Sequence, residues 1–207
     1  MAASDFLFDG PEGSAHRLVL AHGAGAPMDS PFMAAFAEGL GGRGIRVARF
    51  EFPYMRGRRT GGGKRPPDRA PALRQSWLEV IAALGGGPGL VIGGKSMGGR
   101  IASLVADEAG VRGLVCLGYP FHPPGRPERT RVEHLAALQT PILIVQGARE
   151  SLGNRDEVAG YALSAAIGLL WLEDGDHGFK PRKVSGLSER ENWDRGIARV
   201  AEFVLGL

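Results

Sequence analysis

Short apolar runs alternate with segments of helical periodicity along almost the whole chain, and this alternation restricts the fold more than any other feature. The runs are almost continuously hydrophobic, as in parallel strands that are covered on both faces. They cover Arg17–Ala21, Arg46–Phe50, Leu90–Ile92, Gly113–Leu117, Ile142–Val145 and Leu169–Leu172. Helices are predicted at Phe32–Leu40, Ala72–Leu84, Met97–Ala109, Val158–Ala166 and Trp193–Leu205. The pattern predicts a doubly wound α/β domain.

The size and composition of the chain are those of one globular domain. It has 207 residues, of which 43% are hydrophobic and 23% charged, enough for a full buried core. We therefore predict a single domain over residues 1–207, with six or seven mostly parallel strands and helices on both faces. No long insertion separates the predicted strands, so we expect no large cap.

Three further features predict a cytoplasmic protein. The chain has no run of about 18 apolar residues, so no membrane-spanning helix is expected. Its first residues lack the basic and then apolar segments of a signal peptide. The single cysteine, Cys116, excludes a disulfide within the chain and lies in an apolar run typical of a buried structural thiol.

Positive charge is concentrated in one segment. The formal net charge of the chain is +3. Residues 55–70 contain six basic residues and one acidic residue, a net charge of +5, which leaves −2 for the rest of the chain. A nucleic-acid-binding domain instead displays a basic face or stripe, so no nucleic-acid partner is expected. The six basic residues of the segment are Arg56, Arg58, Arg59, Lys64, Arg65 and Arg69.

The segment Gly94-Lys-Ser-Met-Gly98 fits two motifs with incompatible chemistry. Residues 89–96 match G-x-x-x-x-G-K-[ST], a phosphate-binding loop, and residues 94–98 match G-x-S-x-G, a nucleophile elbow. A phosphate-binding loop needs free backbone N–H groups at residues 90–93. Those residues are the best strand candidate in the neighbourhood, and a buried strand uses its N–H groups in sheet pairing. The elbow is therefore favoured.

The elbow places a serine between a strand and a helix. The predicted strand precedes Ser96, Gly94 and Gly98 relieve crowding at the turn, and a helix is predicted from Met97. A serine hydroxyl needs a base to become a good nucleophile. We assign that role to His177, which lies in a short loop after the last predicted strand and follows the serine in chain order.

A carboxylate should orient the histidine. Glu150 lies directly after the predicted strand Ile142–Val145, where the third member of such a triad is expected. Asp156, Asp174 and Asp176 remain alternatives. The last two lie very near His177 in the chain, which makes an approach to its ring awkward, and Asp156 is predicted to belong to the next helix.

Two backbone amides should form an oxyanion hole. The segment His22-Gly-Ala-Gly follows the first predicted strand, so one donor is assigned to Ala24, with Gly25 as the alternative. The second donor is Met97, the residue after the nucleophile. We interpret His22 as a residue that stabilises the turn. This chemistry requires no cofactor and no metal.

Together, His22-Gly-Ala-Gly, Gly94-Lys-Ser-Met-Gly and Asp176-His-Gly resemble the α/β-hydrolase superfamily. Gly93-Gly-Lys-Ser-Met-Gly-Gly-Arg and Gly118-Tyr-Pro-Phe-His-Pro-Pro-Gly are similar to the small capless KANL/Tex-type hydrolases, which are related to dienelactone hydrolases. Members of that group typically have Arg-Asp where this chain has Arg149-Glu150. Some eukaryotic relatives are subunits of chromatin complexes, so the fold alone does not imply catalysis.

The sequence therefore predicts a serine hydrolase that cleaves a carboxylic ester or thioester of a small acyl substrate through an acyl-enzyme. The segments 55–70 and 119–131 are basic and follow strands, so they could attract an anionic substrate or simply be solvated. Candidate substrate contacts are Lys95, Arg58, Arg59 and Tyr119. The alternative is a non-catalytic binding module that holds a protein or nucleic acid with its basic loops. The oligomeric state stays open.

Overall fold

The protein is built around one seven-stranded sheet. The structure is a computed structural model, and it describes residues 5–59, 61, 63 and 65–207; Lys64 of the basic segment lies outside these residues. The strand order is β1-β3-β2-β4-β5-β6-β7, and every neighbouring pair is parallel except β1 with β3. The strands are β1 (Phe6–Asp9), β2 (Arg17–Ala21), β3 (Arg46–Phe50), β4 (Val91–Lys95), β5 (Gly113–Leu117), β6 (Ile142–Gly147) and β7 (Ile167–Leu172).

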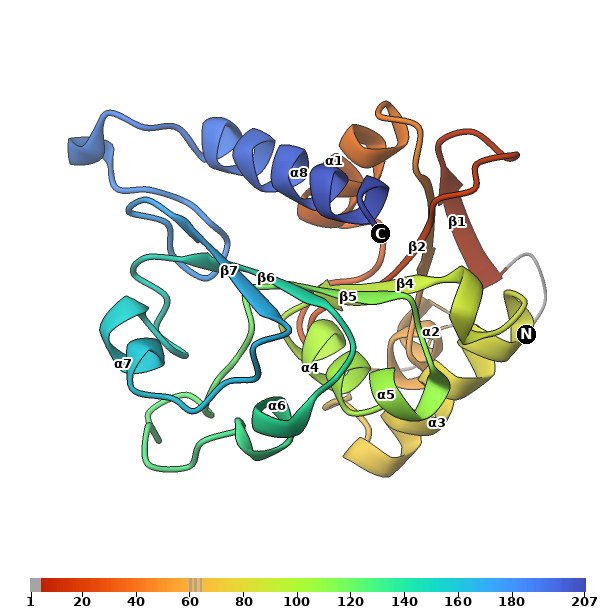
Figure 1. The fold of residues 1–207 in the computed structure, drawn as a ribbon, viewed down its shortest axis with the longest axis horizontal. Helices are drawn as coiled ribbons and strands as arrows, with labels where there is room; N and C mark the ends of the chain where they lie inside the picture. The colour runs from red at the N-terminus through yellow and green to blue at the C-terminus, as the bar shows by residue number, and fades with distance from the viewer. Residues whose placement is uncertain (1–4, 60, 62, 64) are drawn as a thin grey trace.

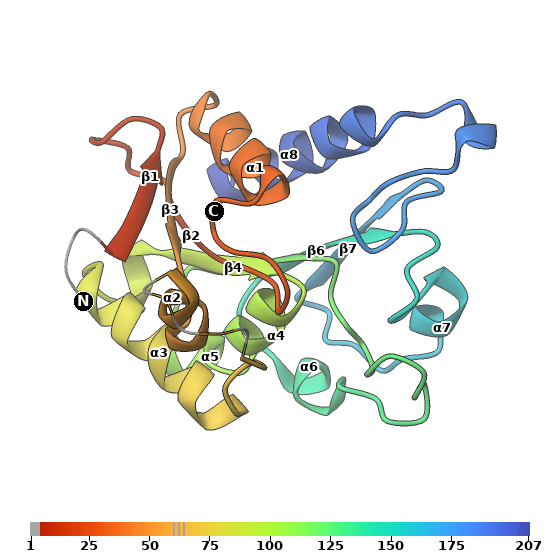
Figure 2. The same ribbon diagram turned by 180° about the vertical axis from the view of Figure 1, so that it is seen from behind.

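Helices cover both faces of this sheet, as Figures 1 and 2 show. Two lie together on one face: α1 (Pro31–Gly41) and α8 (Glu189–Leu205). The opposite face carries α2 (Pro53–Arg59), α3 (Ala70–Ala83), α4 (Met97–Ser103), α5 (Ala106–Ala109) and α6 (Glu133–Ala137). The short helix α7 (Arg155–Ala159) lies beyond the β7 edge. Short 3-10 turns occupy Gly87–Gly89 and Lys183–Ser185.

Alternate residues of the central strands pack into two cores, one on each face of the sheet. Val19 packs in the same cluster as Trp77 of α3. Its neighbours Leu18 and Leu20 pack in the cluster that contains Phe36 of α1. This two-sided burial explains why the strands are hydrophobic at nearly every position. It leaves the carboxyl ends of the parallel strands as the place where polar loops meet, as in other open α/β sheets.

The predicted fold class is confirmed, with differences at individual elements. The strands at residues 17–21, 46–50 and 113–117 have the predicted bounds, whereas β4 ends three residues later than predicted. The predicted helix 97–109 is divided into α4 and α5 at Leu104 and Val105. The prediction of a helix over 158–166 was wrong, because α7 ends at Ala159. β1, α2 and α6 were not predicted, since each is short and has little periodicity of its own.

Across the described ranges, none of the helices combines the length and the hydropathy needed to cross a membrane.

Candidate active site

Ser96 lies on a sharp turn between β4, which ends at Lys95, and α4, which begins at Met97. Its backbone has φ 51° and ψ −114°, a conformation that costs a residue with a Cβ about 1–3 kcal/mol. Gly98 lets the helix start close to β2, because a Cβ there would lie 2.5 Å from the Ala21 carbonyl oxygen and 2.6 Å from that of His22. The strain and the close approach are those expected of a nucleophile elbow.

The phosphate-loop interpretation fails on the same strand. Val91–Lys95 is paired with β2 on one side and β5 on the other. Backbone N–H groups that serve these two ladders are not free to surround a phosphate.

His177 is presented by a tight turn after β7. The Asp176 carboxylate accepts hydrogen bonds from the backbone N–H groups of Gly178 (2.8 Å) and Lys180 (3.0 Å), which closes the turn around the histidine. Helix α8 also holds the turn, since the indole N–H of Trp193 donates a hydrogen bond to the Gly178 carbonyl at 3.0 Å. The histidine position is therefore set by two separate elements.

Glu150 contacts the histidine from the loop after β6. Its side chain is buried, and one oxygen accepts a hydrogen bond from His177 Nδ1 at 2.5 Å. The other oxygen accepts from the Leu152 backbone N–H at 3.1 Å. Because Nδ1 donates to Glu150, Nε2 is the ring nitrogen left to accept a proton, which is the tautomer that a general base needs.

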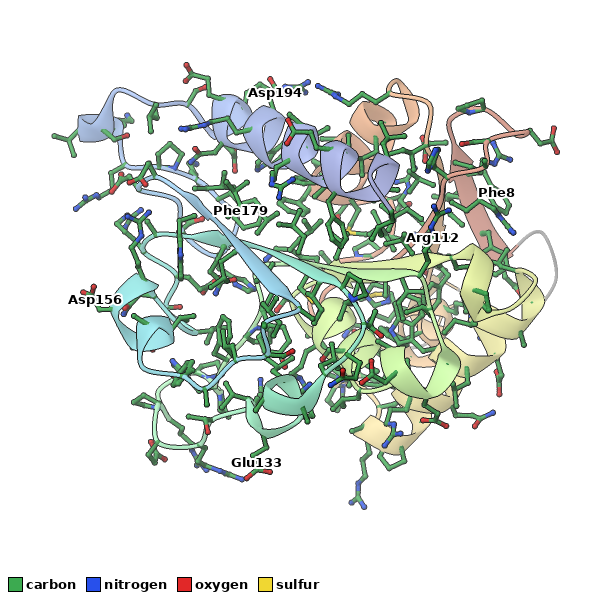
Figure 3. The ribbon with its side chains drawn as sticks, viewed as in Figure 1. Phe8, Arg112, Glu133, Asp156, Phe179 and Asp194 are labelled. Carbon is green, nitrogen blue, oxygen red and sulfur yellow. The ribbon has the colours of Figure 1, made fainter. Side chains whose placement is uncertain are left out.

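The other candidate carboxylates are engaged elsewhere. Asp174 pairs with Arg182 at 2.5 Å and Arg149 at 3.0 Å, and its hydrogen bonds to Arg182 lower its pKa. Asp176 holds the turn described above. Asp156 lies in the first turn of α7, on the outside of the molecule (Figure 3). Of the four carboxylates, Glu150 is the one with a hydrogen bond to the His177 ring.

Ser96 and His177 line the same pocket, although 81 residues separate them in the chain. The pocket has a volume of about 550 Å³ and is walled by side chains of α1 and α8. We call it the apolar pocket, because its wall includes Pro31, Phe32, Met33 and Trp193. The elbow, the histidine turn and the Glu150 loop thus meet at one point at the carboxyl edge of the sheet.

The residues proposed for the oxyanion hole lie beside Ser96. A Cβ on Gly23 would lie 3.7 Å from the Ser96 Cβ, so the loop after β2 runs against the elbow. Within the described part of the chain, the N–H groups of Ala24 and Met97 donate no hydrogen bond. Two free donors next to a strained serine are what an oxyanion hole requires.

His22 stabilises the loop that carries Ala24. The imidazole is fully buried, and its Nε2 accepts a hydrogen bond from the Phe52 N–H at 3.2 Å. Nδ1 is therefore the protonated nitrogen, and it donates to the Gly23 carbonyl at 2.6 Å. Burial lowers the pKa of His22, which keeps the ring neutral in this structural role.

Lys95 lies on the wall of the apolar pocket, and its ammonium is directed at the histidine turn. Nζ donates to the His177 carbonyl at 2.6 Å and lies 5.5 Å from the Phe32 ring centre. Burial lowers the pKa of Lys95 to about 8, against the opposing effect of the Glu150 and Asp176 charges. Lys95, which was predicted to contact the substrate, thus donates a hydrogen bond to a backbone carbonyl of the protein.

Arg58, Arg59 and Tyr119 are not among the described residues that line the two pockets at Ser96. Their contact with substrate stays a prediction. Arg59 donates to both oxygens of the buried Glu51 (2.7 and 2.8 Å) and also pairs with Asp29 at 2.7 Å. These hydrogen bonds, first of all that to Glu51, raise the pKa of Arg59.

Arg58 and Tyr119 also form hydrogen bonds within the protein. Arg58 donates to the Arg65 carbonyl at 2.5 Å and lies over the Tyr54 ring. The Tyr119 side chain is fully buried, and its hydroxyl donates to the Arg131 carbonyl at 3.0 Å. Counting charges in the sequence could not show these partners, because both are backbone carbonyl groups.

A second, smaller pocket of about 280 Å³ also includes Ser96 in its lining. We call it the cationic pocket, since two arginines, Arg100 and Arg131, are among its lining residues. Arg100 was not predicted as a site residue, although it closes the Gly-Gly-Arg end of the elbow segment. The lining residues are Ala24, Ser96, Met97, Arg100, Pro120, Pro124, Arg131 and Leu152.

Comparisons with known proteins identify the family and the fold. Residues 14–205 match the model of a family described as an alpha/beta hydrolase domain. The chain belongs to the α/β-hydrolase family. Within the described ranges, no cluster of three or more His, Cys, Asp or Glu side chains could hold a metal ion.

Solved structures share the fold of this family member at low sequence identity. A lidless α/β serine hydrolase from Xanthomonas campestris is 20% identical with a TM-score of 0.66, and the match covers 94% of this chain and 88% of that one. A dienelactone hydrolase from Anabaena variabilis is 19% identical (TM-score 0.69; 97% and 90% covered). The esterase domain of a Rhodothermus marinus protein is 15% identical (TM-score 0.67; 95% and 90% covered).

Proposed function

We propose that this α/β-hydrolase is a serine esterase or thioesterase that acts on a small-molecule substrate through an acyl-enzyme. The observation that carries the proposal is the arrangement of Ser96, His177 and Glu150, which come from three loops at one edge of the sheet. The esterase and hydrolase structures with the same fold support the same class of reaction.

In the proposed reaction, His177 Nε2 takes the proton from Ser96 as the hydroxyl oxygen attacks the substrate carbonyl carbon. Glu150 keeps the imidazole in the required tautomer and stabilises the imidazolium. The Ala24 and Met97 N–H groups stabilise the tetrahedral oxyanion, each by about 3 kcal/mol in comparable enzymes. His177 then protonates the leaving oxygen or sulfur as its bond to carbon breaks.

Water completes the cycle. It attacks the acyl-enzyme carbonyl while His177 again accepts a proton, and the bond from the carbonyl carbon to Ser96 Oγ breaks. The products are a carboxylic acid and an alcohol or thiol, and Ser96 regains its hydrogen. The sequence-based prediction of a cytoplasmic location stays a prediction.

The experiment is a hydrolysis screen over 4-nitrophenyl esters and acyl thioesters of several chain lengths, run on the wild type and on Ser96→Ala. We expect turnover that falls by at least about 10³-fold in the variant. Turnover that is equal in the two proteins, at matched purity, contradicts the proposal.

The rival function is a non-catalytic module that binds a protein or nucleic acid through its basic loops. The sequence feature that favours this rival is Arg149-Glu150, where the similar KANL/Tex-type hydrolases typically have Arg-Asp. The contact between Glu150 and the His177 ring supports catalysis over this rival, because a triad acid would need such a contact. Binding of a polyanion with steep salt dependence, together with no turnover of any ester, would favour the module.

A further inference from the structure

Two positive charges line the cationic pocket without a negative partner. Arg100 lies on α4, one turn after the nucleophile, and Arg131 follows the loop after β5; both are half-buried. Within residues 5–59, 61, 63 and 65–207, neither guanidinium group makes a hydrogen bond or ion pair. Arg59 illustrates the contrast, since it satisfies its charge with two carboxylates.

The surroundings of both arginines disfavour their charged forms. Burial lowers the pKa of Arg100. Burial and then the neighbouring charge of Arg100 lower the pKa of Arg131. Two like charges that are partly desolvated and close together destabilise a folded chain unless an anion joins them.

The backbone at both arginines is held by hydrogen bonds. The Arg131 backbone N–H donates to the Phe121 carbonyl at 2.7 Å, and its carbonyl accepts from the buried Tyr119 hydroxyl at 3.0 Å. The Arg100 N–H donates to the Ser96 carbonyl at 3.0 Å, so this residue is positioned by the elbow itself. The two backbone positions from which these side chains extend are therefore fixed relative to the nucleophile.

The position of His177 decides which part of the substrate meets these charges. The leaving group must lie on the histidine side of the reacting carbonyl, because His177 protonates it. His177 lines the apolar pocket and is not among the described residues that line the cationic pocket. The cationic pocket, whose lining includes Pro120, Leu152, Arg100 and Arg131, is then the space beside Ser96 that is left for the acyl chain.

We propose that the acyl group carries a terminal carboxylate that Arg100 and Arg131 bind, so that the substrates are half-esters or half-thioesters of dicarboxylic acids with an apolar leaving group. Guanidinium groups bind carboxylates through paired, charge-assisted hydrogen bonds. This inference rests on the proposed function. The reaction adds one water, breaks the bond between the carbonyl carbon and the leaving oxygen or sulfur, and releases a dicarboxylic acid and a neutral alcohol or thiol.

The test compares mono(4-nitrophenyl) esters of dicarboxylic acids with isosteres in which an isopropyl group replaces the terminal carboxylate. Chains of about four to eight carbons are used, and spontaneous cleavage is subtracted. We expect the wild type to favour at least one anionic ester over its isostere by about tenfold or more in kcat/KM, and less so at high salt. In Arg131→Gln and Arg100→Gln this preference should fall about tenfold.

Matched variants control for fold and for net charge. Arg129→Gln removes an exposed positive charge two residues from Arg131 and should keep the preference. Arg131→Lys should retain part of it, which separates loss of charge from loss of structure. Equal kcat/KM for both esters at every chain length overturns the inference, as does an equal loss for both esters in Arg131→Gln.

The two proposals fail in different ways. Hydrolysis of the uncharged isosteres that depends on Ser96, without any preference for the anionic esters, leaves the esterase proposal intact and removes the dicarboxylate inference. If no ester of either kind is hydrolysed in a manner that depends on Ser96, both are removed.

Discussion

The two pockets that meet at Ser96 are built from different chemistry. The apolar pocket is walled by α1 and α8, and two of its polar residues have partners of their own: Lys95 donates to the His177 carbonyl, and the His177 ring contacts Glu150. The cationic pocket is half the volume, and its two arginines have no partner within the described residues. We therefore expect the first side to determine the rate for every substrate and the second to determine which acyl group is chosen.

The arginines of the protein also differ in whether a carboxylate neutralises their charge. The segment that the sequence marks as most basic contains Arg59, whose charge is neutralised by Glu51 and Asp29 from other segments. Arg100 and Arg131 are less conspicuous in the sequence, yet they reach the pocket. A local excess of positive charge thus does not show which cations can bind a ligand.

Glu150→Gln should cause the largest loss. The amide can donate to His177 Nδ1 and favour the wrong tautomer, so kcat/KM is expected to fall by about 10³–10⁴. The loss should be the same factor for anionic and neutral esters, because Glu150 acts through the histidine. Asp156→Asn, on the exposed start of α7, is the matched control and should retain wild-type kinetics. A loss confined to one class of ester contradicts the division between the two sides.

Lys95→Met should lower the rate less and change its pH dependence. Because burial holds the pKa of Lys95 near about 8, the ammonium that donates to the His177 carbonyl is present below that pH and lost above it. We expect wild-type kcat/KM to fall as the pH rises through about 8, and Lys95→Met to be about tenfold slower without that fall. Lys180→Met, on the same turn, is the control. A decline near pH 8 that persists in Lys95→Met excludes Lys95 as its source.

Phe32→Ala should affect the leaving group alone. Phe32 lines the apolar pocket and packs against Phe179 and Trp193. Removing the ring should lower kcat/KM for aryl esters about fivefold to tenfold and that for methyl esters much less. Phe8→Ala, on the edge strand at the far side of the molecule (Figure 3), should change neither. If Phe32→Ala changes the preference for the acyl group instead, the two pockets have been assigned the wrong way round.

Arg59→Met should leave turnover and selectivity unchanged and act on stability. It removes the partner of Glu51, a carboxylate that is only 1% exposed, so the free energy of unfolding should fall by about 2 kcal/mol or more. Urea unfolding measures this change, and adding Glu51→Gln should recover part of it because no buried charge then remains unpaired. A shift in the preference between anionic and neutral esters in Arg59→Met contradicts the division between paired and unpaired arginines.

Much of the fold could be predicted from the sequence, because it depends on long periodic segments. β5 is hydrophobic at each of its last four positions, Leu114 to Leu117, which identifies it without tertiary information. β1 could not be found this way, since four residues at the sheet edge acquire their pairing only from β3. The break between α4 and α5 is equally hidden: the Ser103 hydroxyl donates to the Arg100 carbonyl, a local bond that competes with the helix.

The candidate site shows the same contrast between features with a local sequence signal and features set by tertiary contacts. Ser96, His177 and Glu150 could be proposed from order and spacing, since parallel strands bring their carboxyl ends to one edge. Substrate contacts could not be predicted in this way, because they depend on which charged side chains form ion pairs or hydrogen bonds within the fold. The burial of Tyr119 and the role of Lys95 at the His177 carbonyl are tertiary facts without a local signal.

The most direct measurement is covalent labelling with a fluorophosphonate, followed by intact mass and peptide mapping. The account predicts one adduct, located on Ser96, that is absent in Ser96→Ala and forms much more slowly in His177→Ala. A folded wild-type protein that remains unlabelled, or that is labelled equally when Ser96 is alanine, contradicts it.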